Sequence, residues 1–358
     1  MPPVKKQYRV LIVRLGAMGD ILHSLPAVTA LREAHPGWFL GWAIEPQWRE
    51  LFGTGEARPG TPAMPLVDRV HIVPAKRWAK SPLSPATLGD IRRVRRELRE
   101  AQYDVAVDLQ GAVRSAMIAR WARTGKVIGE AAPREPIAKW LFQQRVATSG
   151  VHVIEQSLEV VNAILRERLP VMLPYLPHDA DADERAARLA QPFVLISPGA
   201  GWGAKRWPAE RYGAVASTLA KAGYGVVINA GAAGTHSGEE KLAEEIVQSS
   251  AMYQSPVPVQ PLAMSIAELT AVTRRASLVI AGDTGPLHLA CALGRPVVGI
   301  FGPTDPARNG PFGCAFRVLR HPESVRDHTR RVEPEAGLLT ITPEAVADAA
   351  LELLQETP

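Results

Sequence analysis

The segment that constrains the fold most strongly is residues 278–306, where two short apolar runs flank a glycine-containing turn and a helix. Residues 278–281 and 297–301 have the continuous apolar character of strands that are buried on both faces. Residues 286–293 between them predict a helix that ends at Gly294. A strand, a helix and a second strand in this order predict a parallel sheet covered by helices.

The turn between the first of these strands and the helix is suited to binding an anion. Unpaired backbone N–H groups and the positive end of the helix dipole converge there. Asp283 lies in the turn, so we expect a ribose hydroxyl or a partly neutralised diphosphate rather than a bare phosphate. His288 follows about one helical turn later and is placed to donate to a phosphate oxygen. A simple crossover in which Asp283 only caps the helix explains the same spacing.

The start of the chain repeats the order of strand, loop and helix. Residues 8–13 predict a buried strand, and residues 14–20 form a glycine-containing loop without the GxGxxG fingerprint of dinucleotide sites. The next helix is expected to be capped at Ser24, with Pro26 in its first turn, and to extend to about Ala34. These features predict the beginning of a doubly wound sheet.

Asp20 is the first candidate catalytic residue. It lies beyond the carboxyl end of the first predicted strand, where open α/β sheets place their chemistry. A helix cap or a turn acid is the alternative interpretation of Asp20. Further strands at 38–44, 69–73 and 103–109 continue the same sheet.

A second α/β unit follows a linker predicted at 169–178, which is rich in proline. Its first strand, 193–196, leads into a loop of small residues that contains Lys205. An ammonium group at this position suits a diphosphate, because it neutralises the charge of a departing phosphate.

Two acids, Glu239 and Glu240, begin a later helix in the second unit, after a loop predicted at 231–238. Either acid is suited to hold ribose hydroxyls, although acids in a first helical turn also simply complement the helix dipole. Ser265 and Glu268 predict a capping box for the next helix.

Composition sets the class of protein. The chain has 358 residues, enough for two α/β domains, and its net charge of +5 is a mild bias. Two cysteines in a chain of this length favour a reducing compartment, and neither has the spacing of a metal ligand. No stretch is long and apolar enough for a membrane span or a signal peptide. We therefore expect a soluble cytoplasmic protein with no nucleic-acid partner.

Basic residues gather in loops and helix starts of the N-terminal half. If they converge they form a pocket for an acidic acceptor, and otherwise they are scattered surface arginines. The amphipathic helix predicted at 88–101 carries further arginines on one face. This face is either attracted weakly to anionic lipid or simply solvated.

These motifs together resemble glycosyltransferase family 9, the ADP-heptose-dependent heptosyltransferases of the lipopolysaccharide inner core. The matching segments span nearly the whole chain in order: GAMGDILHSLPAV from Gly16, YDVAVDLQGAVRSA from Tyr103, REP from Arg134, AKRWP around Lys205, and AGDTGPLHLACALGRPVVGIFGPTDP from Ala281. The enzyme that adds the first heptose to Kdo-lipid A is the subgroup that these segments resemble most.

The resemblance implies a GT-B fold, with two Rossmann-like domains facing a cleft. The expected parts are an acceptor domain at 1–170, an ADP-sugar domain at 171–342 and a helix at 343–358 that packs back onto the N-terminal domain. The implied reaction inverts the anomeric centre, uses ADP-heptose and Kdo-lipid A, and requires neither metal nor cofactor. The implied location is the cytoplasmic face of the inner membrane, with peripheral attachment to its inner leaflet.

The resemblance also assigns roles to single residues. Asp20 matches the general base and Lys205 the diphosphate lysine. Donor-binding positions are Ala200, Gly201, Glu239 (or Glu240), Met264, Asp283, Thr284, Gly285 and His288. Acceptor-binding positions are His23, Arg77, Arg114, Arg120 and Arg134. Relatives often have hydroxyl residues where this chain has Ala200 and Gly201, so phosphate contacts there would come from backbone N–H groups.

Three other functions remain open at this level. A heptosyltransferase with another acceptor, such as a second heptose or a protein, requires the same donor site. A nucleotide-sugar epimerase of the same fold would alter the sugar nucleotide without any acceptor. A nucleotide-binding protein without catalysis is disfavoured, because both a base and a diphosphate lysine are present.

Overall fold

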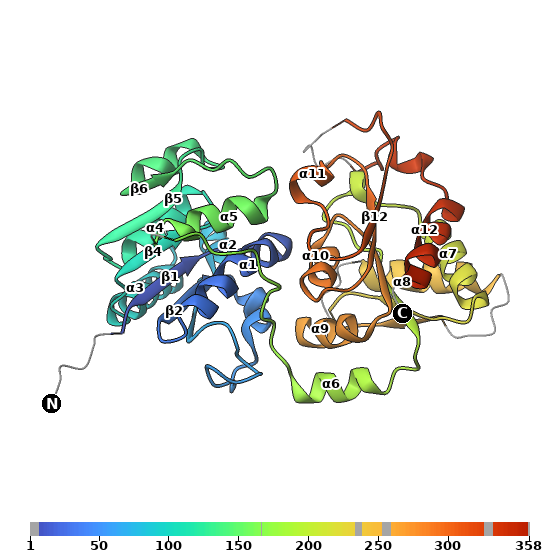
Figure 1. The fold of residues 1–358 in the computed structure, drawn as a ribbon, viewed down its shortest axis with the longest axis horizontal. Helices are drawn as coiled ribbons and strands as arrows, with labels where there is room; N and C mark the ends of the chain where they lie inside the picture. The colour runs from blue at the N-terminus through green and yellow to red at the C-terminus, as the bar shows by residue number, and fades with distance from the viewer. Residues whose placement is uncertain (1–6, 166, 233–237, 253–258, 326–331, 357–358) are drawn as a thin grey trace. The chain divides into compact units, whose positions relative to one another are not determined.

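The structure, a computed structural model, describes residues 7–165, 167–232, 238–252, 259–325 and 332–356. It divides into two compact units, 1–177 and 178–358 (Figure 1). This division falls within the predicted linker at 169–178 but later than the expected domain boundary after residue 170. The loop residues 233–237, part of the predicted 231–238 loop, lie outside the described part of the chain.

The N-terminal unit is built on a parallel sheet of six strands in the order β3-β2-β1-β4-β5-β6. The strands are β1 (Arg9–Val13), β2 (Phe39–Ile44), β3 (Arg69–Ile72), β4 (Val105–Asp108), β5 (Lys126–Glu130) and β6 (Gln144–Val146). The helices are α1 (Met18–Ala34), η1 (Pro46–Phe52), α2 (Ala75–Lys80), α3 (Pro85–Glu100), α4 (Val113–Trp121), η2 (Pro136–Leu141) and α5 (Val153–Asn162).

The C-terminal unit has a second parallel sheet of six strands, in the order β12-β11-β10-β7-β8-β9. The strands are β7 (Phe193–Ser197), β8 (Gly225–Asn229), β9 (Val259–Leu262), β10 (Leu278–Gly282), β11 (Val297–Phe301) and β12 (Phe316–Arg320). The helices are α6 (Ala180–Ala187), η3 (Gly203–Lys205), α7 (Ala209–Lys221), α8 (Glu239–Ala251), α9 (Ile266–Arg275), α10 (Gly285–Ala292), α11 (Pro306–Asn309), η4 (Leu338–Thr340) and α12 (Pro343–Glu356). Two doubly wound parallel sheets confirm the predicted α/β class.

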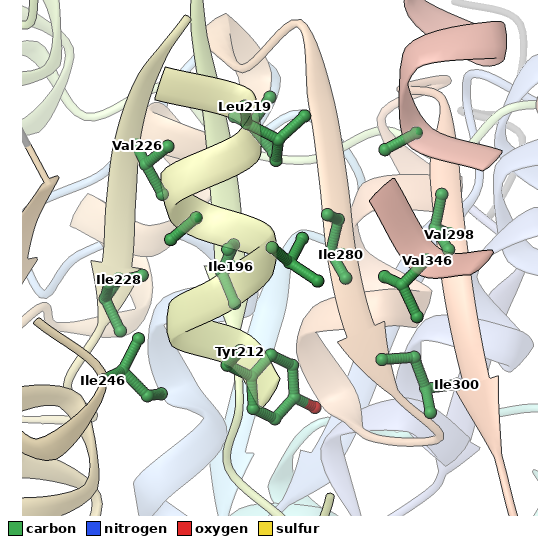
Figure 2. Packing of buried hydrophobic residues seen from close by; sticks show 14 of the residues in the cluster. Ile196, Tyr212, Leu219, Val226, Ile228, Ile246, Ile280, Val298, Ile300 and Val346 are labelled. Carbon is green, nitrogen blue, oxygen red and sulfur yellow. The ribbon is translucent and has the colours of Figure 1, made fainter. Parts of the chain in front are cut away.

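Alternate residues of the central strands form the core on each face of the sheets. In the N-terminal unit, Leu11 and Val13 of β1 pack in one cluster with Val94 and Leu98 of α3. Figure 2 shows the corresponding cluster of the C-terminal unit, where Ile196 and Ile280 lie under helix α7. Burial on both faces explains why the sequences of these strands are continuously apolar.

The last helix packs within the C-terminal unit. Helix α12 belongs to this unit (Figure 1), and its expected packing onto the N-terminal domain stays a prediction. Val346, Ala350 and Leu353 of α12 are buried in the same cluster as the strands β7, β8, β10 and β11. The apolar stripe of α12 is therefore satisfied within its own unit.

Helix α1 begins earlier than expected. The predicted cap at Ser24 is wrong, since α1 starts at Met18 and Pro26 lies inside it. The Ala17 N–H donates to Asp20 Oδ2 at 3.1 Å, so Asp20 caps the helix from its first turn. The Ser24 hydroxyl instead donates to the Asp20 carbonyl at 3.0 Å.

Four strands, β5, β6, β9 and β12, are not predicted by the sequence pattern. Strand β6 is one edge of the N-terminal sheet and strands β9 and β12 are the two edges of the C-terminal sheet, and the sequences of all three lack a continuous apolar run. Pro261 within β9 is tolerated because an edge strand leaves one side unpaired. Among the helices in the described ranges, none is both long and apolar enough to cross a bilayer.

Candidate active site

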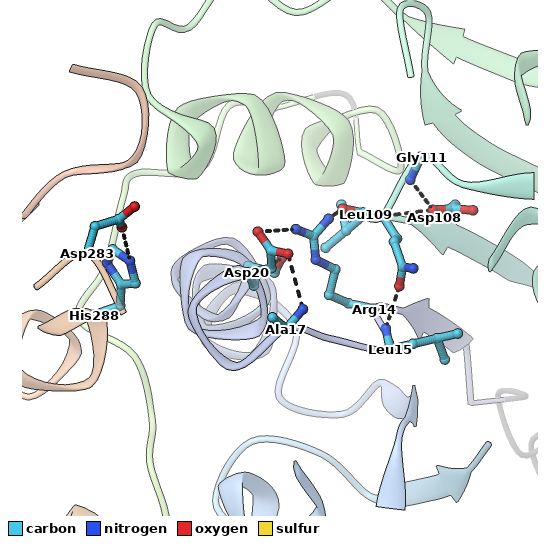
Figure 3. A network of polar contacts seen from close by, with 11 residues as sticks. Arg14, Leu15, Ala17, Asp20, Asp108, Leu109, Gly111, Asp283 and His288 are labelled. Atoms are coloured by element: carbon cyan, nitrogen blue, oxygen red, sulfur yellow. Dashed lines mark hydrogen bonds and ion pairs between the residues drawn. The ribbon is translucent and has the colours of Figure 1, made fainter. Parts of the chain in front are cut away.

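A charged cluster lies at the carboxyl ends of β7 and β10 in the C-terminal unit. Lys205, at the end of η3, donates from Nζ to the Asp283 carbonyl at 3.1 Å and also pairs with the Asp283 carboxylate. His288 on α10 lies on the other side of this carboxylate, with Nε2 3.2 Å from Oδ1 (Figure 3). The structure thus brings together the predicted residues Lys205, Asp283 and His288.

The charge state of Asp283 follows from these two partners. Its side chain is only 9% exposed, and burial by itself raises the pKa of the carboxyl. The hydrogen bond and charge of His288, together with Lys205, outweigh this effect and hold the pKa well below its ordinary value. Asp283 is therefore an anion that fixes the positions of one ammonium group and one imidazole.

Trp202, a residue without a predicted role, also contacts Lys205. The Lys205 Nζ lies 4.3 Å from the centroid of the Trp202 ring, which is the geometry of a cation–π contact. A Trp shortly before a Lys in a loop of small residues is the sequence signal for this contact.

The predicted donor residues Thr284 and Gly285 form the N-cap and the first residue of α10. The unpaired backbone N–H groups of this helix start therefore lie beside the Lys205 cluster.

Glu239, rather than Glu240, faces the neighbouring loops of the sheet. Its carboxylate lies where a Cβ on either Gly199 or Gly231 would be, 2.4 and 2.1 Å from those positions. The Met264 N–H donates to the Gly231 carbonyl at 2.8 Å. Glu239 and Met264 therefore border one loop, that of Gly231, and Glu240 is exposed.

Ala200 and Gly201, whose backbone N–H groups are predicted to contact phosphate, lie in the loop between β7 and η3. Ala200 is half-buried and Gly201 is exposed. A Cβ on Gly201 would meet no atom within 4 Å, so the backbone is open there. Backbone N–H groups are consequently the groups that this part of the loop offers to a ligand.

Asp20 provides an accessible carboxylate at the carboxyl end of β1 in the N-terminal unit. It is 42% exposed and forms an ion pair with Arg14, from Nη2 to Oδ1 at 2.9 Å (Figure 3). Its second oxygen accepts the Ala17 N–H, so both oxygens are oriented while the group remains open to solvent. The alternative interpretation as a helix cap is thus correct, and it is compatible with a chemical role.

The loop after β4 supports Arg14. Arg14 Nη1 donates to the Leu109 carbonyl, and the Leu15 N–H donates to Gln110 Oε1 at 2.8 Å. Asp108, which is fully buried, accepts the N–H groups of Gln110 and Gly111 at 2.7 and 2.8 Å. The sequence pattern indicates neither Arg14, which directly follows β1, nor Asp108, the last residue of β4, because their contacts join segments far apart in the sequence.

The pKa of Asp108 is raised to about 6, in contrast to that of Asp283. Burial is the largest cause, and it exceeds the opposing hydrogen bonds from Gly111, Ser115 and Gln110 and the charge of Arg14. The Asp108 carboxyl organises the loop through N–H and O–H donors rather than through a direct cation.

Two of the predicted acceptor residues lie near the loop that follows β4. The Arg134 backbone nitrogen is 2.9 Å from the position of a Cβ on Gly111. Arg114, exposed at the start of α4, acts electrostatically on the carboxylate of Glu45, which is buried. Burial raises the pKa of Glu45, and the Lys76 N–H and the charges of Lys76 and Arg114 oppose that rise.

The other three acceptor predictions are more dispersed. Arg77 pairs with Asp90 on α3, and Arg120 is exposed in the last turn of α4. His23 is buried in α1, where its ring lies edge-on to the His152 ring with 5.4 Å between the ring centroids.

The described residues contain no group of three or more His, Cys, Asp or Glu side chains that could hold a metal ion.

The chain is similar to proteins of one glycosyltransferase family. The model of glycosyltransferase family 9 (heptosyltransferase) matches residues 91–338. Lipopolysaccharide heptosyltransferase 1 of Escherichia coli K12 is 31% identical over 327 residues, which cover 88% of this chain and 94% of that protein. The enzyme of the same name from Pseudomonas aeruginosa is 29% identical over 313 residues, 85% of this chain and 81% of that protein.

A solved structure extends the similarity to the fold. E. coli heptosyltransferase WaaC with ADP has a TM-score of 0.77 and 27% identity, covering 98% of this chain and 100% of that one. The same enzyme with ADP-2-deoxy-2-fluoro heptose gives a TM-score of 0.75 at 26% identity, with coverage of 98% and 100%. The α/β architecture of this chain is therefore that of the heptosyltransferase structures.

Proposed function

The chain belongs to glycosyltransferase family 9, the heptosyltransferases, and we propose that it transfers a heptose from ADP-heptose to a Kdo residue of a lipid A precursor. Lipopolysaccharide heptosyltransferase activity is supported by curated relatives that match most of the chain. The donor is supported by the similarity to an enzyme solved with ADP and with an ADP-heptose analogue.

The observation that carries the proposal is the Lys205–Asp283–His288 cluster beside the N-terminus of α10. A departing ADP carries negative charge on its β-phosphate. Lys205 and the backbone N–H groups that begin α10 are the groups that would stabilise it. Asp283 fixes Lys205 and lowers the net positive charge of the site, which favours a diphosphate over unselective anion binding.

The chemical step proposed is a single displacement with inversion. The acceptor hydroxyl oxygen forms the new bond to the anomeric carbon, and the bond from that carbon to the diphosphate oxygen breaks. The electron pair of the broken bond leaves with ADP, and the hydroxyl proton passes to the Asp20 carboxylate. Asp20 suits this role because it is open to solvent and its two oxygens are held by Arg14 and Ala17.

The acceptor is proposed because the chain is more similar to a heptosyltransferase 1 than to a heptosyltransferase 2 of the same organism. The chain is 31% identical to E. coli heptosyltransferase 1 but 24% identical to E. coli heptosyltransferase 2. Transfer to an existing heptose, the second candidate, therefore has less support than transfer to Kdo. Because the lipid A acceptor is anchored by acyl chains, we place the reaction at the cytoplasmic face of the inner membrane.

Product analysis tests the proposal. The purified protein is incubated with ADP-heptose and one of three additions: Kdo-lipid A, heptosyl-Kdo-lipid A, or no acceptor. We expect a product one heptose heavier only from Kdo-lipid A, with linkage analysis showing inversion. Transfer only to the heptosylated acceptor would move the assignment to the second enzyme, and altered sugar nucleotide without acceptor would indicate an epimerase.

A further inference from the structure

The short helix η2 exposes two large apolar side chains on one side. Ile137 is 69% exposed and Trp140 is 70% exposed. Residues three apart in a 3₁₀ helix lie above one another, so both side chains project in the same direction. Two large apolar side chains exposed on one side of a short helix favour a contact surface over an ordinary solvated face.

Positive groups surround this apolar surface. The Arg145 guanidinium lies 4.9 Å from the centroid of the Trp140 ring, and the Lys139 ammonium lies 5.6 Å from it. Residues 131–146 contain three basic residues and one acid, Glu135. The Glu135 carboxylate accepts the Val113 N–H at 2.8 Å and so faces the start of α4.

We propose that the surface formed by Ile137, Lys139, Trp140 and Arg145, here named the η2 surface, docks on an anionic phospholipid leaflet. Trp combines an apolar ring with a polar N–H and is favoured at the boundary between acyl chains and headgroups. Lys and Arg beside it place their charges among phosphates while their stems cover apolar area. The partner is thus lipid of net negative charge, matched by cations that flank an apolar centre.

The arginine helix α3 is the competing surface, and its charges are differently arranged. Arg93 lies 2.8 Å from Glu97, and Arg96 lies 3.8 Å from Glu100. Acids on the same helix therefore reduce the positive field of α3. This contrast favours η2 over α3 as the lipid contact.

The position of η2 also fits the proposed reaction, on which this step of the inference rests. The helix begins two positions after Arg134, a predicted acceptor residue whose backbone lies against Gly111. An acceptor held in the leaflet by its acyl chains would present its sugar close to the docking surface. The η2 surface thus brings the enzyme to its acceptor without taking part in the chemistry.

Vesicle sedimentation of the full-length protein, without substrates, tests the docking directly. We expect at least tenfold stronger binding to vesicles of mixed phosphatidylglycerol and phosphatidylcholine than to phosphatidylcholine alone. The double variant Lys139→Gln/Arg145→Gln should lose roughly 25-fold, since each cation near such a surface contributes about fivefold. The double variant Ile137→Ser/Trp140→Ser should lose roughly tenfold, because it removes the apolar side chains that would enter the leaflet. Thermal unfolding should match wild type, because three of these four side chains are exposed and Lys139 is partly exposed.

Two controls accompany these variants. Met252, 83% exposed at the end of α8, is an apolar group on the other unit, so Met252→Ser should bind vesicles as wild type does. Arg92→Gln/Arg96→Gln removes two charges from α3 and should retain most of the binding. Equal binding of wild type and both η2 variants would overturn the proposal, as would a loss confined to the α3 variant or equal binding to neutral and anionic vesicles.

Activity on two forms of the acceptor separates docking from chemistry. The η2 variants should lose turnover with the acceptor embedded in anionic vesicles but retain it with an acyl-free, water-soluble Kdo acceptor. Equal loss with both would assign these residues to the sugar site and contradict the docking role. If wild type transfers to neither acceptor, the proposed function fails, and vesicle binding still decides the inference.

Discussion

The two units have the same strand topology but place opposite charges after their first strands. In each sheet the first and fourth strands of the unit are neighbours, β1 with β4 and β7 with β10. This is the switch point where open α/β sheets bind ligands. The segment after β1 carries the Asp20 carboxylate, whereas the segment after β7 carries the Lys205 ammonium.

The buried acids at the fourth strands show how each unit supports its charge. Asp108 ends β4 and accepts hydrogen bonds from two N–H groups and one O–H group. Asp283 follows β10 and lies between Lys205 and His288. Burial therefore dominates the pKa of Asp108, which is raised, while the cations dominate that of Asp283, which is lowered. One topology thus presents an exposed carboxylate in one unit and a buried cluster of opposite charges in the other.

Removing the charge of Asp283 should have the largest effect. Asp283→Asn leaves Lys205 and His288 buried without their anion, which should cost about 3–5 kcal/mol of unfolding free energy and weaken ADP binding. Because the pKa of Asp283 is lowered in the folded state, its contribution is complete above the ordinary carboxyl pKa of about 4. Denaturant unfolding across pH measures the difference in unfolding free energy between wild type and Asp283→Asn. This difference should shrink as pH falls below about 4. A deficit independent of pH would contradict the ionic account.

Lys205→Ala should lower turnover by about 10²–10³-fold and weaken ADP binding as well, since it removes the cation proposed to stabilise the leaving diphosphate. Calorimetric ADP titration and initial rates measure the two effects. Arg206→Ala, an exposed neighbour, serves as the matched control and should behave as wild type. Unchanged ADP affinity in Lys205→Ala would remove Lys205 from the donor site.

Arg14→Gln should lower kcat by about 10–100-fold, because Asp20 loses the partner that orients it. ADP affinity should not change, and Arg14→Lys should recover part of the rate. The double variant Arg14→Gln/Asp20→Ala should be no slower than Asp20→Ala alone, since Arg14 acts through Asp20. A further loss in the double variant would show that Arg14 has an independent role. Arg188→Gln, which breaks an exposed pair with Glu184, is the control.

The smallest effect distinguishes the two acids that begin α8. Glu239→Gln should weaken binding of ADP-heptose by about tenfold, in line with the loss of a charged hydrogen bond of about 1.5 kcal/mol. Glu240→Gln should change it little, because only Glu239 faces the loops of Gly199 and Gly231. The opposite order of effects would exchange the two assignments.

The comparison also shows what could be read from the sequence. Strands such as β1 and β10 are buried on both faces, so a continuous apolar run identified them. The Lys205 and Asp283 positions followed from glycine-containing loops at strand ends. Edge strands such as β9 lacked that signal. Arg14 and Asp108 could not be assigned, because their roles depend on contacts between β1 and β4, which are far apart in the sequence.

The central claim is that Asp20 accepts the proton of the acceptor hydroxyl. Measuring heptose transfer by the Asp20→Ala variant tests this claim most directly. Wild type and variant are compared for heptose transfer to Kdo-lipid A and for ADP binding, with Asp20→Glu as a conservative partner. We predict a loss of turnover of about 10²–10⁴-fold in Asp20→Ala with ADP affinity unchanged, because only the acceptor's proton loses its base. Turnover equal to wild type in Asp20→Ala would contradict the account.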